Sequence, residues 1–212
     1  MKFLLPLLMS FSLFASHSVA ILDYWFGPLE SREVDPMAHA SLWFKKNPET
    51  DAEIEKLFGQ DLRQASNGFY QWTESPRERL ALIILLDQMA RNIHRNSPEA
   101  FMHDSLARWL ALEAIALKED HQLLPVERKF LYMPLMHAED LELQTFCVEL
   151  FTRLVHEADP GFKRAAEISL EYAIRHRDII AQFGRFPHRN RVLGRESTNE
   201  EIAFLDTPGS SF

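Results

Sequence analysis

Hydrophobic residues recur at helical spacing along nearly the whole chain after residue 20, and this pattern narrows the choice of fold more than any other feature. No five-residue window combines the apolar alternation and the turn signals that a β-strand requires. Seven glycines against 16 phenylalanines and 4 tryptophans also favour regular, well-packed structure. The pattern predicts an all-α fold in which short connections join sequential helices into antiparallel hairpins.

Local signals predict where several helices begin and end. Ser-Pro at 75–76 with Glu78 forms a capping box and begins a helix that runs to His94, apolar nearly all round in its middle. Asp-Pro at 159–160 begins another helix, and Gly184 supplies the residue that ends it. We expect further helices at about 36–46, 51–66, 97–118, 125–133 and 138–157, and a last one with a second capping box over 197–200.

Length and charge limit the class of protein. The 212 residues contain no linker or low-complexity segment after the first 20, so we expect a single domain over 21–212. A net charge of −8 argues against a nucleic-acid-binding protein, because phosphate contacts need basic surface. The single cysteine, Cys147, sits in an apolar run, and we expect a buried, inert thiol there.

The first 20 residues have the layout of a secretory signal peptide. Lys2 precedes an apolar stretch of about 12 residues, shorter than the ~20 that a membrane-spanning helix needs. Ser18 and Ala20 place small residues before a cut after Ala20. We therefore predict export to the periplasm or medium and no stable membrane span after processing. A cytoplasmic protein and one anchored by an uncleaved leader are the alternatives.

An arginine-rich segment is the first candidate for chemistry. Residues 175–195 hold six arginines, two histidines and one aspartate, and no lysine. Arg185 and Arg189 lie beyond the helix end at Gly184, in a loop that also holds His188 and Asn190. The planar guanidinium suits carboxylate or phosphate groups. Two interpretations stay open: ion pairs with acidic residues of neighbouring helices, and an anion-binding pocket.

Two further polar clusters lie at helix ends. Asp87, Arg91 and Asn92 follow a very apolar run, so we expect them to be partly buried, paired with one another or facing a polar cavity. His137 and Glu139 come just before or within the first turn of a helix. His137 with Glu139 or Asp140, together with His176 or His188, could form a divalent-metal site. No recognised ligand spacing supports one, so we assign no metal ligand, and the residues name no cofactor.

Other motifs are absent or have structural explanations. The sequence contains no G-x-S-x-G, Walker A or G-x-G-x-x-G motif, which removes support for common hydrolase, nucleoside triphosphatase and dinucleotide-binding classes. The aromatic residues at 24–26, 43–44 and 72 are expected in the core.

Four segments resemble a bacterial family of uncharacterised proteins, the domain of unknown function 924. They are LDYWFGP (22–28), LALIILLDQMARNIHR (80–95), FLYMPLMHAEDLELQ (130–144) and FGRFPHRNRVLGREST (183–198). The resemblance implies a compact tetratricopeptide-like α-α superhelix and supplies no activity. This sequence has Met89-Ala90 where the family usually has Phe-Pro, and it adds the leader.

These observations predict a helical domain that binds a small anionic ligand or a peptide. Arg185 and Arg189 would clamp the anionic group, and asparagines would orient it. The candidate residues are Asp87, Arg91, Asn92, His137, Glu139, Arg185, His188, Arg189 and Asn190.

Two alternatives use the same sequence differently. A hydrolase of phosphorylated or carboxylated small molecules would use His137 or His188 as general base, oriented by Asp87 or Glu139, with Arg185 stabilising a developing anion. A protein-interaction scaffold would present a groove without catalysis. The sequence decides neither between these classes nor on an oligomeric state.

Overall fold

The computed structural model describes residues 17–29, 37–68 and 74–210, and every regular element in these ranges is a helix, as predicted. A helix at 17–26 comes first. The labelled elements follow in chain order: α3 (Ala40–Phe44), α4 (Pro48–Ser66), α5 (Pro76–Ile83), η1 (Ile84–Met89), α6 (Ala90–Ile93), η2 (Pro98–Phe101), α7 (Asp104–Ala116), η3 (Glu119–Gln122), α8 (Pro125–Met136), α9 (Leu141–Glu157), α10 (Pro160–Phe183), η4 (Pro187–Arg189) and α11 (Asn199–Leu205).

The predicted starts and stops are confirmed where a cap and a proline coincide. Ser75 accepts a hydrogen bond from the Glu78 amide, and Asp159 accepts one from the Phe162 amide. Each side chain satisfies an amide that has no partner inside its helix. Gly184 ends α10 with a positive φ of 69°, which glycine adopts without steric cost.

Two helix starts differ from the sequence-based expectation. The helix expected at 97–118 is a 3₁₀ turn, η2, followed by α7. The last capping box lies one residue later, because Thr198 caps α11 and Glu201 completes the box. Ser197 is not the cap, since its hydroxyl accepts a hydrogen bond from Asn190. Glu201 is buried and Glu200 is exposed, so the glutamate that completes the capping box is the one that packs against the protein.

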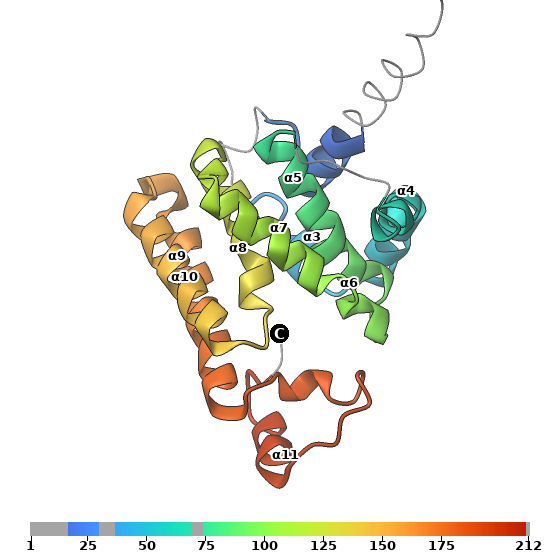
Figure 1. Cartoon of the computed structure of the whole chain (residues 1–212), viewed down its shortest axis with the longest axis vertical. Coiled ribbons are helices and arrows are strands. Elements are labelled where there is room, and N and C mark those ends of the chain that lie inside the picture. Colours follow the sequence, from blue (N-terminus) through green and yellow to red (C-terminus); the bar gives the residue numbers. More distant parts are fainter. Residues whose placement is uncertain (1–16, 30–36, 69–73, 211–212) are drawn as a thin grey trace, which may run out of the picture.

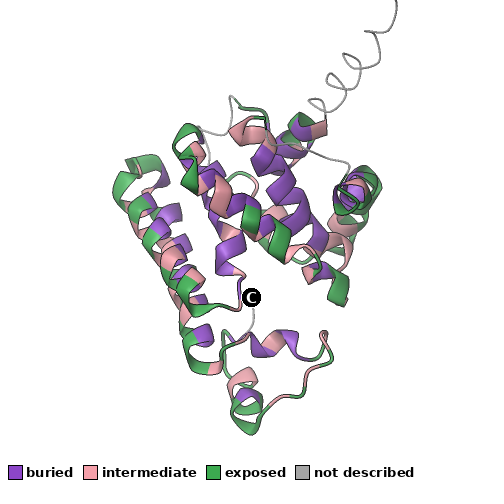
Figure 2. Ribbon diagram, viewed as in Figure 1, coloured by how far each residue is buried: buried purple, intermediate pink, exposed green. Residues whose placement is uncertain are grey.

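The core is built around α5 and η1 (Figures 1 and 2). These elements form one continuous helix whose residues are almost all buried, and α4, α7 and α8 contact it. The hairpin of α9 and α10 packs on the outer side of α8, with only Ala158 and Asp159 between the two helices. Helices α8, α9 and α10 thus form consecutive packed neighbours, and the C-terminal segment with α11 lies beyond the end of this group.

The helix at 17–26 contributes its second half to the core. Trp25 and Phe26 are buried, and both rings contact Phe130 edge to face, as expected for core aromatics. Phe44 differs, since about half of its surface is exposed. Trp72 lies outside the described residues. Cys147 is fully buried, as predicted, and burial raises the pKa of its thiol.

The predicted leader lies partly within this helix. Residues 1–16 are outside the described residues, and 17–20 form the first turn. His17 Nδ1 lies 2.9 Å from Asp61 Oδ1 on α4, and Ser18 is buried. Within the described ranges, no helix is both long and apolar enough to cross a membrane.

Candidate functional site

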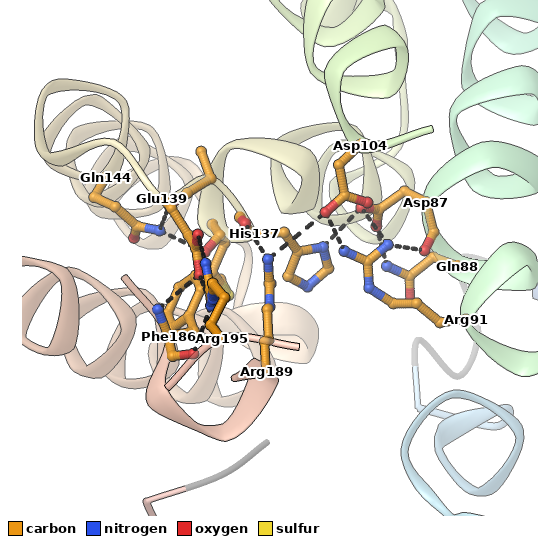
Figure 3. Close-up of polar contacts among 12 residues, drawn as sticks. Asp87, Gln88, Arg91, Asp104, His137, Glu139, Gln144, Phe186, Arg189 and Arg195 are labelled. Atoms are coloured by element: carbon orange, nitrogen blue, oxygen red, sulfur yellow. Dashed lines mark hydrogen bonds and ion pairs between the residues drawn. The ribbon is translucent and has the colours of Figure 1, made fainter. Parts of the chain in front are cut away.

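Parts of the three polar sequence motifs meet around His137, the residue that ends α8 (Figure 3). Asp87, Arg91 and Asp104 lie on one side of its ring, and Arg189 approaches from the other. These side chains come from η1, α6, the first turn of α7 and the end of η4. We call Asp87, Arg91, Asp104, His137 and Arg189 the His137 cluster.

Asp87 anchors this cluster from the middle of the core. It is fully buried, and its carboxylate oxygen Oδ1 lies 2.7 Å from His137 Nδ1 and 3.2 Å from Arg91 Nη1. Gln88 also donates a hydrogen bond to it. Burial alone would raise the pKa of Asp87, but the charge of Arg91 and the contact with His137 hold it well below its usual value. Asp87 is therefore an ionised, buried carboxylate.

A π-helical segment presents Asp87 in this position. The residues of η1 follow α5 without a break, and the chain then returns to α-helix at Ala90. Each π turn holds more residues than an α turn, and such segments are frequent at functional sites. The π turn occurs here with Met89-Ala90, so it requires no proline.

Arg91 and Arg189 converge on one carboxylate oxygen. Asp104 Oδ2 lies 2.9 Å from Arg91 Nη2 and 3.7 Å from Arg189 Nη1. The aromatic rings of Phe101 and Phe186 flank the Arg189 guanidinium, with ring centres 4.8 and 4.5 Å from its central carbon. Burial and then the charge of Arg91 lower the pKa of Arg189 to about 10. The two cations are thus close enough to repel each other.

Two buried polar atoms of the cluster have unused hydrogen-bonding capacity. Asp104 Oδ1 and Arg189 Nε are buried and make no hydrogen bond with any described residue. Buried polar atoms in folded proteins rarely stay unsatisfied, so such atoms mark a place for water or a ligand. Burial raises the pKa of Asp104 despite its two arginine neighbours. The Asp104 carboxylate is accordingly the weakest-held anion of the cluster.

Two more histidines border the cluster. The His176 ring on α10 lies 6.3 Å from the His137 ring and 5.5 Å from Phe186. Burial lowers the pKa of His176 to about 3 and that of His188 to about 4, and nearby positive charge acts in the same direction. Both rings are therefore neutral near pH 7. Within the described ranges, no three or more His, Cys, Asp or Glu side chains are arranged to hold a metal ion.

Glu139 and the C-terminal loop form a separate, fully paired network. Glu139 accepts two hydrogen bonds from Arg195, at 2.6 and 2.9 Å, and one from the Phe186 amide at 2.8 Å. Asn190 is buried, accepts a hydrogen bond from Arg195 Nε, and donates to Glu201. These contacts fix the loop against the connection between α8 and α9. Asn190 and Glu139 therefore hold the loop in place, and their polar groups are already engaged.

Arg185 and Asn92 bind residues outside the cluster. Arg185 forms two hydrogen bonds to Glu201, at 2.6 and 2.8 Å, and this contact is the main reason that the pKa of Glu201 falls to about 2. Asn92 donates to Asp51 on α4, which also binds Arg95. The structure thus does not place Arg185 beside Arg189 as a clamp, because Glu201 already occupies its guanidinium.

Four of the nine predicted residues therefore meet directly, namely Asp87, Arg91, His137 and Arg189. Sequence reasoning missed Asp104 and Phe101. Both lie in the segment predicted as one uninterrupted helix, where the structure has the 3₁₀ turn η2, which ends at Phe101, and then α7, which begins at Asp104. An aspartate at a helix start is usually explained by capping, so Asp104 gave no functional signal.

Two surface depressions lie elsewhere. One, of about 510 Å³, is lined by residues of the end of α10 and the start of α11, including Arg185 and Glu201. The other, of about 600 Å³, follows α9 from Leu141 to Glu149. Neither is lined by a residue of the His137 cluster.

Comparison with known proteins identifies relatives without a known function. The model of a family described as bacterial protein of unknown function, DUF924, matches residues 21–209. A solved structure of a protein of unknown function, ATU0120 from Agrobacterium tumefaciens, is similar, with a TM-score of 0.76 and 33% sequence identity. The alignment covers 91% of this chain and 98% of that one. No curated protein sequence matches the chain.

Proposed function

Since the chain belongs to the DUF924 family, for which no activity is described, we propose a function from geometry alone: it binds a small anionic ligand at the His137 cluster. The observation that carries this proposal is the convergence of Arg91 and Arg189, from different elements, on a single oxygen of Asp104. Two guanidinium groups held together despite mutual repulsion are typical of carboxylate or phosphate recognition.

Access to the cluster is through Arg91 and His137. The side chain of Arg91 is 20% exposed and that of His137 is 12% exposed, whereas Arg189 is 8% exposed. Nδ1 of His137 is committed to Asp87, and its Nε2 makes no hydrogen bond with a described residue. An incoming anion would thus meet Arg91 and His137 Nε2 first and Arg189 behind them.

Asp104 would act as an internal competitor for this ligand. Its carboxylate occupies the position between the two arginines that a ligand carboxylate or phosphate would take. Asp104 is the first residue of α7, so a change of its side-chain rotamer would release both arginines without moving the helix. A free carboxylate, a phosphate and the C-terminus of a peptide share the required chemistry.

Isothermal titration calorimetry with inorganic phosphate and with succinate tests the proposal. Arg91→Gln should weaken binding about tenfold or more, since a hydrogen bond to a charged group contributes about 1.5–3 kcal/mol. Asp104→Asn should strengthen binding, because it removes the competing charge. Arg164→Gln is the matched control, as Arg164 is exposed on α10. The proposal would be disproved if neither ligand gave a measurable heat of binding with the wild type, or if the wild type and Arg91→Gln bound with equal affinity.

A second candidate function, hydrolysis of a phosphorylated or carboxylated small molecule, is favoured by the Asp87–His137 pair. The 2.7 Å contact orients the imidazole and leaves Nε2 to accept a proton from water, which is the arrangement of a general base. Arg91, in place of the Arg185 expected from the sequence, would stabilise the developing negative charge.

Turnover separates the two candidates. The wild type would be assayed against generic phosphatase, esterase and amidase substrates, with His137→Ala as the reference. Activity that this substitution abolishes, with binding of inorganic phosphate retained, would establish the hydrolase. Equal background rates in both proteins would leave binding as the function.

A further inference from the structure

Helix α7 and its two flanking turns expose four large apolar side chains on one side. Met102, Leu106, Trp109 and Leu117 are 64%, 40%, 55% and 58% exposed. Their spacing of three or four residues, or a multiple of it, places them in one stripe along the helix and its two flanking turns. The partly buried Leu112 lies at one edge of this row and is counted with it. We call these five side chains the α7 stripe.

The opposite side of the same helix is also apolar. Ala107, Leu110, Ala111 and Ala114 are buried against the core. Figures 1 and 2 show α7 crossing the front of the molecule with exposed residues toward the viewer and no other element over it. The outer face therefore lacks a cover among the described elements.

The five side chains of the α7 stripe are uncharged. Glu113, which lies among the stripe positions, is bound to Arg79, whose nearly buried side chain also pairs with Glu119. This neutrality matters because the chain as a whole has a net charge of −8, so most other surfaces of two copies would repel each other. At the α7 stripe two copies would instead bring uncharged side chains together.

The stripe is also nearly symmetric about its centre. Met102 lies seven residues before Trp109, and Leu117 lies eight residues after it. A two-fold axis near Trp109 would therefore set Met102 of one copy opposite Leu117 of the other, with the two indole rings together in the middle. Such self-complementarity is what an isologous interface requires.

We propose that two copies of this chain associate through the α7 stripe, with their α7 helices antiparallel. The exposed stripe offers on the order of 500 Å² per copy, at the upper end of the patches found on monomers. Two copies would bury roughly 1,000 Å², which is the lower limit for a specific interface. We expect a weak dimer, because this area is at the limit for specific association, and the α7 stripe shares no residue with the His137 cluster.

Sedimentation equilibrium of the full chain between 1 and 100 µM tests the proposal. The wild type should approach twice its 24.7 kDa mass as concentration rises. Trp109→Glu should raise the dissociation constant at least a hundredfold, because it places two like charges on the two-fold axis. Leu57→Glu is the matched control, since Leu57 is equally exposed but lies on α4. This control variant should still dimerise.

Two outcomes would overturn the proposal. One is a wild type that stays monomeric at 100 µM, which would mean that the stripe does not bind a second copy. The other is a dimer that Trp109→Glu leaves intact, which would place the interface elsewhere. Circular dichroism of both variants verifies that each is folded, as expected for substitutions at exposed positions.

Discussion

Replacing Asp87 by asparagine removes the ionised carboxylate around which the His137 cluster is built. The side chain is fully buried and contacts His137, Arg91 and Gln88. Removing one partner of a buried ion pair costs about 3–5 kcal/mol, because the other charge stays buried. Asparagine keeps one acceptor oxygen, and Arg91 keeps its contact with Asp104, so we expect a loss at the lower end, about 3 kcal/mol. A domain with roughly 5–15 kcal/mol of stability stays folded after this loss.

Urea unfolding followed by tryptophan fluorescence measures this loss, and its dependence on pH identifies its origin. The pKa of Asp87 is depressed in the folded protein, so its contribution is complete above the unfolded pKa of about 4 and is lost as pH falls toward the folded value. The difference between wild type and Asp87→Asn should thus be about 1 kcal/mol smaller at pH 3 than at pH 5. Asp178→Asn, at an exposed position on α10, is the control. A loss below 1 kcal/mol, or a difference unchanged over this pH range, would refute the reasoning.

Three further predictions concern buried groups outside the cluster. Gln144→Leu should lower the free energy of unfolding, measured in urea, by about 1–3 kcal/mol, because Gln144 donates to the Met136 carbonyl at 2.6 Å and leucine leaves that buried oxygen unsatisfied. Thr145→Val, at the neighbouring exposed position, is the control and should change this free energy little. Burial lowers the pKa of Lys129 to about 8, so the unfolded state binds more protons between pH 8 and 10.5; the stability of the wild type relative to Lys129→Met should rise with pH over that window. Cys147 should react with a thiol reagent only after unfolding, and rapid reaction of the native protein would contradict its burial.

Local signals in the sequence predicted the fold class and several helix boundaries. Ser75 with Pro76 and Asp159 with Pro160 specify helix starts through backbone amides next to them in the chain, so no tertiary information is needed. The π turn at 84–89 is different. Nothing in its residue types distinguishes it from an α-helix, and its position follows from what packs around it.

The partners of the candidate residues were harder to predict than the residues themselves. Asp87 and His137 are 50 residues apart in sequence, and no spacing rule joins them. Arg185 and Arg189, on adjacent turns of one loop, bind different partners, since the tail folds back to place Glu201 against Arg185. Polarity in a buried segment identified which residues need partners, whereas the arrangement of the helices decides which partner each one obtains.

If the predicted leader is removed, the helix at 17–26 would link folding to that cleavage. The bond after Ala20, where the leader would be cut, lies inside this helix, and the next side chain, Ile21, has no exposed surface. A protease reaches such a bond only in chains that have not yet folded or that have opened transiently. Cleavage and folding of each newly made chain would then compete, and their relative rates would decide the outcome. A chain that folds first would retain its leader, and a delay in folding during export would favour its removal.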